Sequence, residues 1–255
     1  DILQTTGVRV ESEKARLIYE RGGAAVDHDD GRVRFPPGLV AECLRKCPPS
    51  FHMKALDRRN DILVGGNVTY MSLFAGMRTV DLDTWETRVP TIKDQDDACK
   101  VADGLEYVFA STSYTPYSEI ADEPAAMMLP LTTWSRLKHF AKISRIGTTL
   151  GSHIWEMQMA DVVGMDVFAA MEAAPPLTWY GDAIDCAWAC AEKGLPVEVG
   201  CGAVMGGTGP ATIAGTLVQS TAEMMAAIAM VQLVHPGTGI LANSFVFAQN
   251  MMTGA

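Results

Sequence analysis

The 255-residue chain is poor in basic residues and has no cluster of them. It carries 20 Lys and Arg against 30 Asp and Glu, which gives a formal net charge of −10 at pH 7. The basic residues nearest to one another, at positions 45–46 and 58–59, are interrupted by prolines and acidic neighbours. Because a nucleic-acid surface requires clustered Lys and Arg, the composition argues against nucleic acid as a partner.

Long uninterrupted apolar runs are also missing. The longest, residues 222–234, contains Glu223 and Gln232 and is shorter than the ~18–20 residues that a membrane span requires. The sequence therefore predicts no transmembrane helix and no membrane partner. The chain starts at Asp1 without an initiator Met or a signal-peptide pattern, and we expect further sequence to precede it.

Several cofactor motifs are absent. Neither GxGxxG after a strand nor GxxxxGK[ST] occurs, so dinucleotide and nucleoside-triphosphate binding have little support. No Lys ends a predicted strand, which argues against a Schiff-base aldolase. Six cysteines in a chain of this length indicate free thiols in a reducing compartment, and we expect a cytoplasmic protein. Two pairs, Cys43/Cys47 and Cys186/Cys190, have helical spacing but lack further ligands, so we expect no metal site.

The stretch from residue 194 to residue 245 carries the strongest structural signal. Residues 197–204 are short, β-branched and bounded by breakers, as in a strand buried on both faces. The glycine-rich loop 205–210 follows, and Pro210 suits the first position of a helix that runs to residue 234. A second strand is expected at 238–245. We predict that the two strands are adjacent and parallel, with the helix crossing between them.

Alternating strands and helices extend over residues 91–255. Strands are expected at 107–113, 146–150, 166–172, 197–204 and 238–245, and helices at 92–105, 127–144, 153–163, 180–193 and 210–234. This alternation is the signature of a parallel α/β fold. The five strands are fewer than the eight of a closed (β/α)₈ barrel.

Residues 1–90 have a different, locally connected pattern. Helices are expected at 12–20 and 36–46, a hairpin around Asp-Gly at 30–31, a second hairpin within 61–71, and a third strand pair around residues 83–84. We therefore divide the chain into an N-terminal α+β cap, residues 1–90, and a barrel region, residues 91–255.

Three separated segments resemble one protein family. They are residues 7–10 with 35–40 and 47–51, the run 206–219 continued at 222–223 and 229–237, and the chain end 252–255. In this order they are similar to the trimethylamine methyltransferase (MttB-type) family. The resemblance implies a TIM (β/α)₈-type barrel, incomplete in this chain. It also implies methyl transfer from a tertiary or quaternary methylated amine to the cobalt of a corrinoid (cobalamin) carried by a partner protein, with no cofactor bound by this chain alone.

Site residues are expected at the carboxyl ends of barrel strands. Glu172 and His153 are the catalytic candidates, because Glu172 ends an apolar run and His153 follows a strand. Substrate contacts are expected from the glycine-rich loop, the last strand and two further aromatic rings: Met205, Gly206, Gly207, Thr208, Asn243, Phe245, Tyr114 and Trp179. These aromatic residues, together with Trp155 and Tyr180, are candidates for a cage around a quaternary ammonium, although such a ring more often simply packs in the core.

Two alternatives and one assembly hypothesis remain open. Glu172 and His153 would also suit another TIM-barrel lyase or hydrolase, and an incomplete barrel could be a non-catalytic binding piece. The helix at 210–234 is apolar on every side, and such a helix is covered by something. We expect a subunit or partner contact there, and hence a homo-oligomer.

Overall fold

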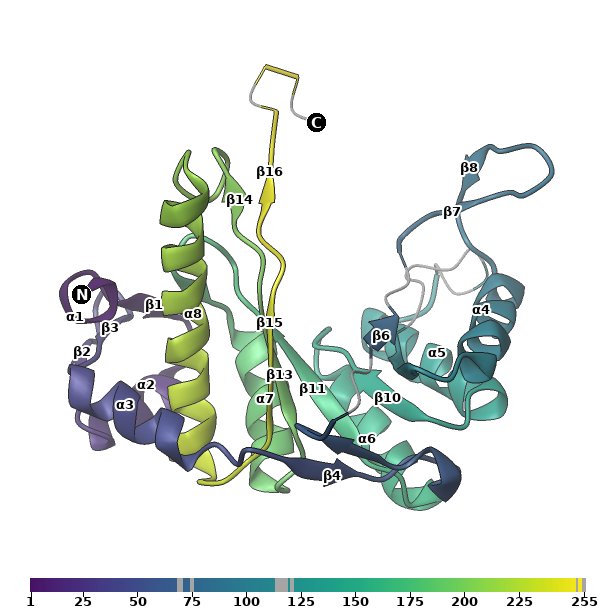
Figure 1. The fold of residues 1–255 in the computed structure, drawn as a ribbon, viewed down its shortest axis with the longest axis horizontal. Helices are drawn as coiled ribbons and strands as arrows, with labels where there is room; N and C mark the ends of the chain where they lie inside the picture. The colour runs from purple at the N-terminus through teal and green to yellow at the C-terminus, as the bar shows by residue number, and fades with distance from the viewer. Residues whose placement is uncertain (68–70, 74–75, 113–118, 120–121, 251, 254–255) are drawn as a thin grey trace. The chain divides into compact units, whose positions relative to one another are not determined.

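The computed structural model describes residues 1–67, 71–73, 76–112, 119, 122–250 and 252–253, and the chain forms two compact units (Figure 1). Unit 1 comprises residues 1–48 and 170–255, and unit 2 comprises residues 49–169. Strand β11 (Val167–Glu172) begins in unit 2 and ends in unit 1. The expected boundary at residue 90 is a different division of the chain and stays a prediction.

Unit 2 contains a parallel sheet with helices between its strands. Strand β9 (Val108–Ser111) pairs in parallel with β6 (Met71–Leu73) and with β10 (Ile143–Ile146), which pairs in parallel with β11. Helices α4 (Ile92–Gly104), α5 (Ala125–His139) and α6 (Ser152–Val163) alternate with β9, β10 and β11 along the chain. This confirms the α/β class. Closure into an eight-stranded barrel stays an expectation.

Helix α4 begins where the sequence predicted. The Thr91 hydroxyl accepts the Asp94 N–H at 3.3 Å, and the Asp94 carboxylate accepts the Thr91 N–H at 2.7 Å. This reciprocal capping box satisfies two backbone donors that have no partner inside the helix. Arg88 also donates to both Asp94 oxygens, which holds the pKa of that carboxyl well below its usual value.

Two predictions within unit 2 concern short strands. The hairpin expected within 61–71 falls in part on residues 68–70, which lie outside the described residues, and of its described part β5 (Ile62–Val64) pairs antiparallel with the earlier strand β4 (Phe51–Met53), while β6 joins the parallel sheet. Strand β10 lies at 143–146 and not at 146–150, since Ser144 and Arg145 interrupt its two fully buried isoleucines and hide the apolar pattern. The predicted antiparallel pair around residues 83–84 is confirmed as β7 (Thr79–Val80) and β8 (Thr87–Arg88). Unit 2 also contains the 3₁₀ turn η1 (Arg58–Asn60).

Unit 1 combines a small sheet with a parallel strand pair. The small sheet has the order β12 (Thr178–Trp179), β1 (Val8–Val10), β3 (Arg32–Arg34), β2 (Ala25–Asp27), and its β2–β3 hairpin is the one predicted around Asp30-Gly31. Strands β13 (Val197–Cys201) and β15 (Ile240–Ser244) are parallel neighbours over five residue pairs, as predicted. Beyond them, β14 (Val204–Met205) and β16 (Phe247–Ala248) form a second parallel pair (Figure 1).

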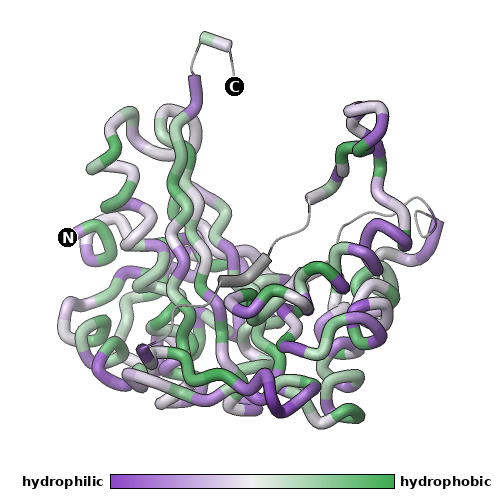
Figure 2. The backbone as a smooth tube through the Cα atoms, turned by 45° about the vertical axis from the view of Figure 1, so that its right-hand side comes forward, coloured by the Kyte–Doolittle hydropathy of each residue, from purple (hydrophilic) through white to green (hydrophobic). Residues whose placement is uncertain are grey.

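Hydropathy changes sign repeatedly along the chain, as expected of elements that each bury one side (Figure 2). Helix α8 (Ile213–Val234) is the exception, because it is apolar on every side. It is the last helix of unit 1, after α1 (Ile2–Thr5), α2 (Glu13–Arg21), α3 (Pro37–Lys46) and α7 (Gly181–Glu192). Helices α2, α3 and α7 and strand β13 all pack on α8. By length and composition α8 would be able to cross a membrane, but 61% of its most apolar window is buried inside the protein, as in a core helix.

The N-terminal helices supply much of the cover that α8 was expected to need. The fully buried Tyr19 on α2 donates its hydroxyl to the Ala226 carbonyl at 2.8 Å, and its ring meets Phe35 edge-on with centroids 5.0 Å apart. Met230 is completely buried and Met225 is half-buried within the chain itself. A subunit contact is therefore not needed to cover Met230, and the oligomeric state stays a prediction.

Tyr19→Ala should lower the free energy of unfolding by about 3–5 kcal/mol, because it removes a fully buried ring from the contact between α2 and α8. Tyr19→Phe, which removes only the hydroxyl bond to Ala226, should cost about 1 kcal/mol. Denaturant unfolding followed by circular dichroism measures both. Tyr107→Ala is the control, since that ring is 54% exposed and its loss should change stability by less than about 0.5 kcal/mol. Equal effects of Tyr19→Ala and Tyr107→Ala would contradict the packing of α2 on α8.

Candidate functional site

Three strand ends come together in unit 1. Glu172 ends β11, and the next residue, Ala173, donates its N–H to the Gly200 carbonyl of β13 at 3.0 Å. Phe245 follows β15 and donates its N–H to the Cys201 carbonyl of β13 at 3.1 Å. The carboxyl ends of β11 and β15 thus flank the carboxyl end of β13.

Glu172 and Phe245 both pack against the backbone at the end of β13, where two glycines leave room for them. A Cβ atom on Gly200 would lie 3.3 Å from Cγ of Glu172 and 3.3 Å from Cε1 of Phe245. A Cβ atom on Gly202 would lie 2.0 Å from Cε2 of Phe245, closer than any side chain allows. The Phe245 ring is 43% exposed and Glu172 is half-buried. A partly exposed aromatic ring near a carboxylate is suited to bind an organic cation.

The same face of β13 carries an acid that the sequence interpretation missed. Glu198, two residues before Gly200, is buried, and its Oε1 accepts a hydrogen bond from Nδ2 of Asn243 at 3.0 Å. The predicted contact residue Asn243 therefore lies on the same face as Phe245 with its amide engaged. The alternation of residues along β13 could have revealed Glu198 from the sequence, because Glu198, Gly200 and Gly202 are spaced by two and so share one face of the strand.

The glycine-rich loop is a compact turn closed by its own backbone. The N–H groups of Gly207, Thr208 and Gly209 all donate to the Val204 carbonyl at 2.9–3.0 Å, and Gly206 has φ +82°. The Thr208 hydroxyl accepts the Val204 N–H at 2.9 Å. Gly207 and Thr208 are exposed, whereas Met205 and Gly206 are half-buried. The loop presents a glycine and a threonine to solvent on a fixed backbone.

The helix after this loop starts later than predicted. Helix α8 begins at Ile213, and Thr212 is its N-cap, with the Thr212 hydroxyl accepting the Gly215 N–H at 3.2 Å. Pro210 lies before the cap, and its carbonyl accepts the Thr216 hydroxyl at 2.7 Å. Threonine satisfies a free N–H at a helix start better than glycine or proline, which accounts for the difference.

The remaining predicted residues do not join this cluster in the described structure. Trp179 is completely buried in the small sheet, where it pairs with Val10, and such burial is typical of a packing role. His153 belongs to unit 2, at the start of α6, and is also buried. Tyr114 lies outside the described residues. The catalytic roles of Glu172 and His153 stay predictions.

Near His153, unit 2 contains a buried ion pair that the sequence did not reveal. Nη2 of Arg136 lies 3.2 Å from Oε2 of Glu156, and both side chains are almost fully buried. Glu156 also accepts the Thr133 hydroxyl at 2.6 Å and the Gly147 N–H at 3.2 Å, while Nη1 of Arg136 donates to the Ser111 carbonyl at 3.4 Å. The pair thus holds the carboxyl ends of β9 and β10, and breaking it would leave a buried charge uncompensated.

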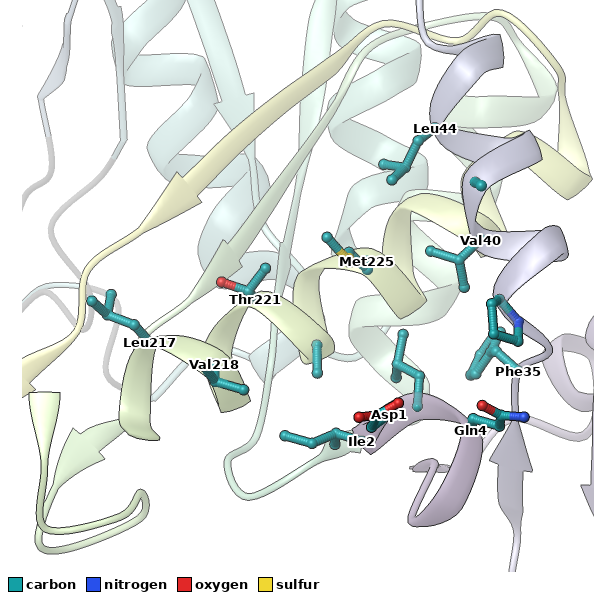
Figure 3. Close-up of a pocket in the computed structure, with 14 residues that line it drawn as sticks. Asp1, Ile2, Gln4, Phe35, Val40, Leu44, Leu217, Val218, Thr221 and Met225 are labelled. Atoms are coloured by element: carbon teal, nitrogen blue, oxygen red, sulfur yellow. The ribbon is translucent and has the colours of Figure 1, made fainter. Parts of the chain in front are cut away.

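An apolar groove and the cysteine thiols are further features that could form a site. An apolar groove of about 530 Å³ lies between α1, α3 and α8, where Figure 3 shows Val40 and Leu44 of α3 facing Met225 of α8. Its lining has few polar groups to orient a substrate, unlike typical active sites. All six cysteines are free thiols, and the described residues contain no group of three His, Cys, Asp or Glu placed to hold a metal ion.

The chain matches a family model described as trimethylamine methyltransferase (MTTB) over residues 1–255. It is 25% identical over 259 residues to trimethylamine methyltransferase MttB of Desulfitobacterium hafniense (strain DSM 10664 / DCB-2), covering 98% of this chain and 52% of the relative. It is 26% identical over 266 residues to glycine betaine methyltransferase of D. hafniense (strain Y51), covering 100% of this chain and 54% of that protein. With trimethylamine methyltransferase MttB of Methanosarcina thermophila the identity is 25% over 256 residues, covering 94% and 52%. The chain spans about half the length of these relatives.

Gly202→Ala should destabilise the protein by about 1–3 kcal/mol, because the added methyl group and the Phe245 ring cannot share one position. Adding Phe245→Ala should remove the clash, so the double variant should be more stable than the sum of the single effects by at least about 0.5 kcal/mol. Denaturant unfolding measures the cycle. Gly181→Ala is the control, since its Cβ would meet open space. Strictly additive effects at 202 and 245 would mean that the ring does not pack on Gly202.

Proposed function

The chain belongs to the trimethylamine methyltransferase (MttB) family, and we propose on this premise that the full-length protein transfers a methyl group from a methylated amine to the cobalt of a corrinoid on a partner protein. The family match over residues 1–255 is the observation that carries the proposal. Relatives named for trimethylamine and for glycine betaine both align over nearly the whole chain. The substrate class is therefore tertiary or quaternary methylated amines.

The cluster at the end of β13 suits such a substrate. A quaternary ammonium carries a positive charge that it cannot lose, and it is attracted to the face of an aromatic ring and to a carboxylate. Phe245 offers a partly exposed ring, and Glu172 offers a carboxylate that packs on the same glycine. We propose that the Phe245 ring contacts the methylated nitrogen and that the Glu172 carboxylate balances its positive charge.

The reaction makes modest chemical demands on these residues. In an in-line displacement the C–N bond breaks and its electron pair stays on nitrogen, so a quaternary substrate leaves as a neutral amine without a general acid. The partner's corrinoid supplies the nucleophile that accepts the methyl group. The task of this chain is to hold the N–CH₃ bond in line and to limit access of water.

The glycine-rich loop suits the approach of a second protein. Gly207 and Thr208 are exposed, and the turn is fixed by three bonds to the Val204 carbonyl. Exposed glycine backbone lets a large planar group come close without meeting a side chain. We place Met205, Gly206, Gly207 and Thr208 on the side of the mouth that faces the substrate and the corrinoid, with Asn243 supporting it from β15.

We retain two further expectations as proposals. Six free thiols are typical of a reducing compartment, which supports a cytoplasmic location. We also propose a homo-oligomer, with the apolar groove and the exposed Ile213 and Val218 of α8 as the contact surface. The alternative of a lyase or hydrolase that uses Glu172 and His153 stays a prediction.

The direct test incubates the full-length protein with trimethylamine or glycine betaine and cob(I)alamin, and follows formation of methylcobalamin by its absorbance. We expect methyl transfer from at least one methylated amine. A folded protein that transfers no methyl group from either amine, with its corrinoid protein present, would overturn the proposal.

Phe245→Leu should weaken binding of the cationic substrate roughly 2- to 30-fold, because the ring face is lost while the apolar volume is largely kept. Glu172→Gln should weaken it about tenfold or more, because a negative charge is lost at constant size. Isothermal titration calorimetry of the full-length protein measures both effects. The matched ligand is the neutral analogue in which carbon replaces the quaternary nitrogen. Its affinity should be unchanged by Glu172→Gln, and equal losses for both ligands would assign Glu172 a structural role.

A further inference from the structure

Helix α8 carries several buried polar side chains, and two of them, Gln219 and Glu223, lie one turn apart. Gln219 is 8% exposed and Glu223 is completely buried. Nε2 of Gln219 donates to Oε1 of Glu223 at 3.0 Å, so the two side chains form one unit. An apolar pair at these positions would avoid the cost of burying an amide and a carboxyl group. Stability alone therefore does not account for the pair.

The pair is bonded to two different loops at the carboxyl ends of the strands. Oε1 of Glu223 accepts the Leu177 N–H at 2.7 Å, and Leu177 lies in the loop that follows Glu172. Nε2 of Gln219 donates to the Thr208 carbonyl at 3.0 Å, and Thr208 lies in the glycine-rich loop that follows β13. One buried hydrogen-bonded chain thus runs from the loop after β11 to the loop after β13.

The loop after β11 needs such an anchor. Leu177 has φ +49°, in the left-handed region that favours glycine and is sterically costly for a residue with a side chain. A residue persists in that conformation when its surroundings hold it there, and such strain is concentrated at functional sites. The bond from the Leu177 N–H to Glu223 holds the backbone five residues after Glu172.

The Glu223 carboxyl group is only partly satisfied. Burial raises its pKa, while the bonds from Leu177 and Gln219 act in the opposite direction. Its second oxygen, Oε2, is buried and accepts no hydrogen bond from the described residues. One oxygen of the group therefore accepts from Leu177 and Gln219, while the other has no partner among the described residues, which is unusual for a purely structural acid.

We propose that Gln219 and Glu223 are positioning residues that fix the loop after β11 and the glycine-rich loop relative to each other, and so set Glu172 against Gly207 and Thr208. The consequence for catalysis rests on the proposed function. The positioning role does not depend on the proposed function, because it concerns only how two loops are held relative to each other.

The same helix provides a matched control at its other end. Gln232 is also fully buried, its Nε2 donates to the Thr238 carbonyl at 2.8 Å, and its Oε1 accepts the Gly237 N–H at 2.8 Å. These bonds hold the turn before β15, at the opposite end of the strand from Phe245. Gln219→Leu and Gln232→Leu are thus the same substitution at buried sites of one helix.

Hydrogen exchange of the full-length protein tests the proposal without any activity assay. Gln219→Leu should accelerate exchange of the amides at 207–209, and Glu223→Leu that of Leu177, each roughly 10- to 100-fold. Glu223→Gln keeps an oxygen that can accept from Leu177 and should leave this amide protected. Gln232→Leu should accelerate exchange only around residues 237–238. Unchanged protection at 177 and 207–209 in Gln219→Leu and Glu223→Leu, or the same acceleration there in Gln232→Leu, would overturn the proposal.

Methyl-transfer kinetics provide the second readout. Gln219→Leu and Glu223→Leu should lower kcat about tenfold or more, because small displacements of bound groups are costly for in-line transfer, while Glu223→Gln and Gln232→Leu retain it. Should Glu223→Leu fail to fold, Gln219→Leu and Glu223→Gln still decide the outcome. A parent protein without methyl transfer would refute the proposed function, and the exchange experiment would still decide the positioning role.

Discussion

Unit 1 depends on the burial of α8 from several sides. Strand β13 packs on this helix, and α2, α3 and α7 pack around it. Because an apolar helix must be covered along most of its circumference, the first 48 residues of the chain are needed to complete a core whose other parts come from residues 170–255. Tyr19 illustrates this dependence, since its hydroxyl bonds to Ala226, 207 residues later in the chain. The N-terminal segment is thus part of the core of unit 1.

A helix that is apolar on every side can carry polar groups only where each finds a partner, and this restriction gives the few polar residues of α8 defined tasks. Ser220 donates to the Cys201 carbonyl at the end of β13, and Thr216 donates to the Pro210 carbonyl. Gln232 holds the turn at the other end. Each bond joins the helix to the end of a strand or to a connection between elements. The helix therefore orders the loops at both ends of the strands that pack on it.

The sequence predicted the elements of regular pattern and failed where tertiary contacts decide. Thr91 with Asp94 and the turn at Asp30-Gly31 were predictable because their hydrogen bonds are local. The pairing of Ile62–Val64 with Phe51–Met53 and the join of Met71–Leu73 to the parallel sheet were not, since several partners suit a short strand. Among the candidate residues, Glu172, Asn243 and Phe245 were predicted from their place at strand ends, and the structure brings them together at β13. Glu198, Glu223 and the Arg136–Glu156 pair were missed, because only the folded chain shows which polar groups are buried together.

The alternation within β13 explains how one strand serves both a core and a site. Val197, Val199 and Cys201 are completely buried, and burial raises the pKa of the Cys201 thiol, with the nearby Glu223 adding to the effect. The other face carries Glu198, Gly200 and Gly202, and it receives Asn243, Glu172 and Phe245 from the two neighbouring strands. Successive side chains of a strand point to opposite faces, so substitutions on one face leave the packing of the other face largely unchanged. Glycine at 200 and 202 leaves room that the neighbours fill with a carboxylate and an aromatic ring. The strand supplies the floor of the candidate site, and the two side chains that we propose contact a cation, Glu172 and Phe245, come from the strands on either side.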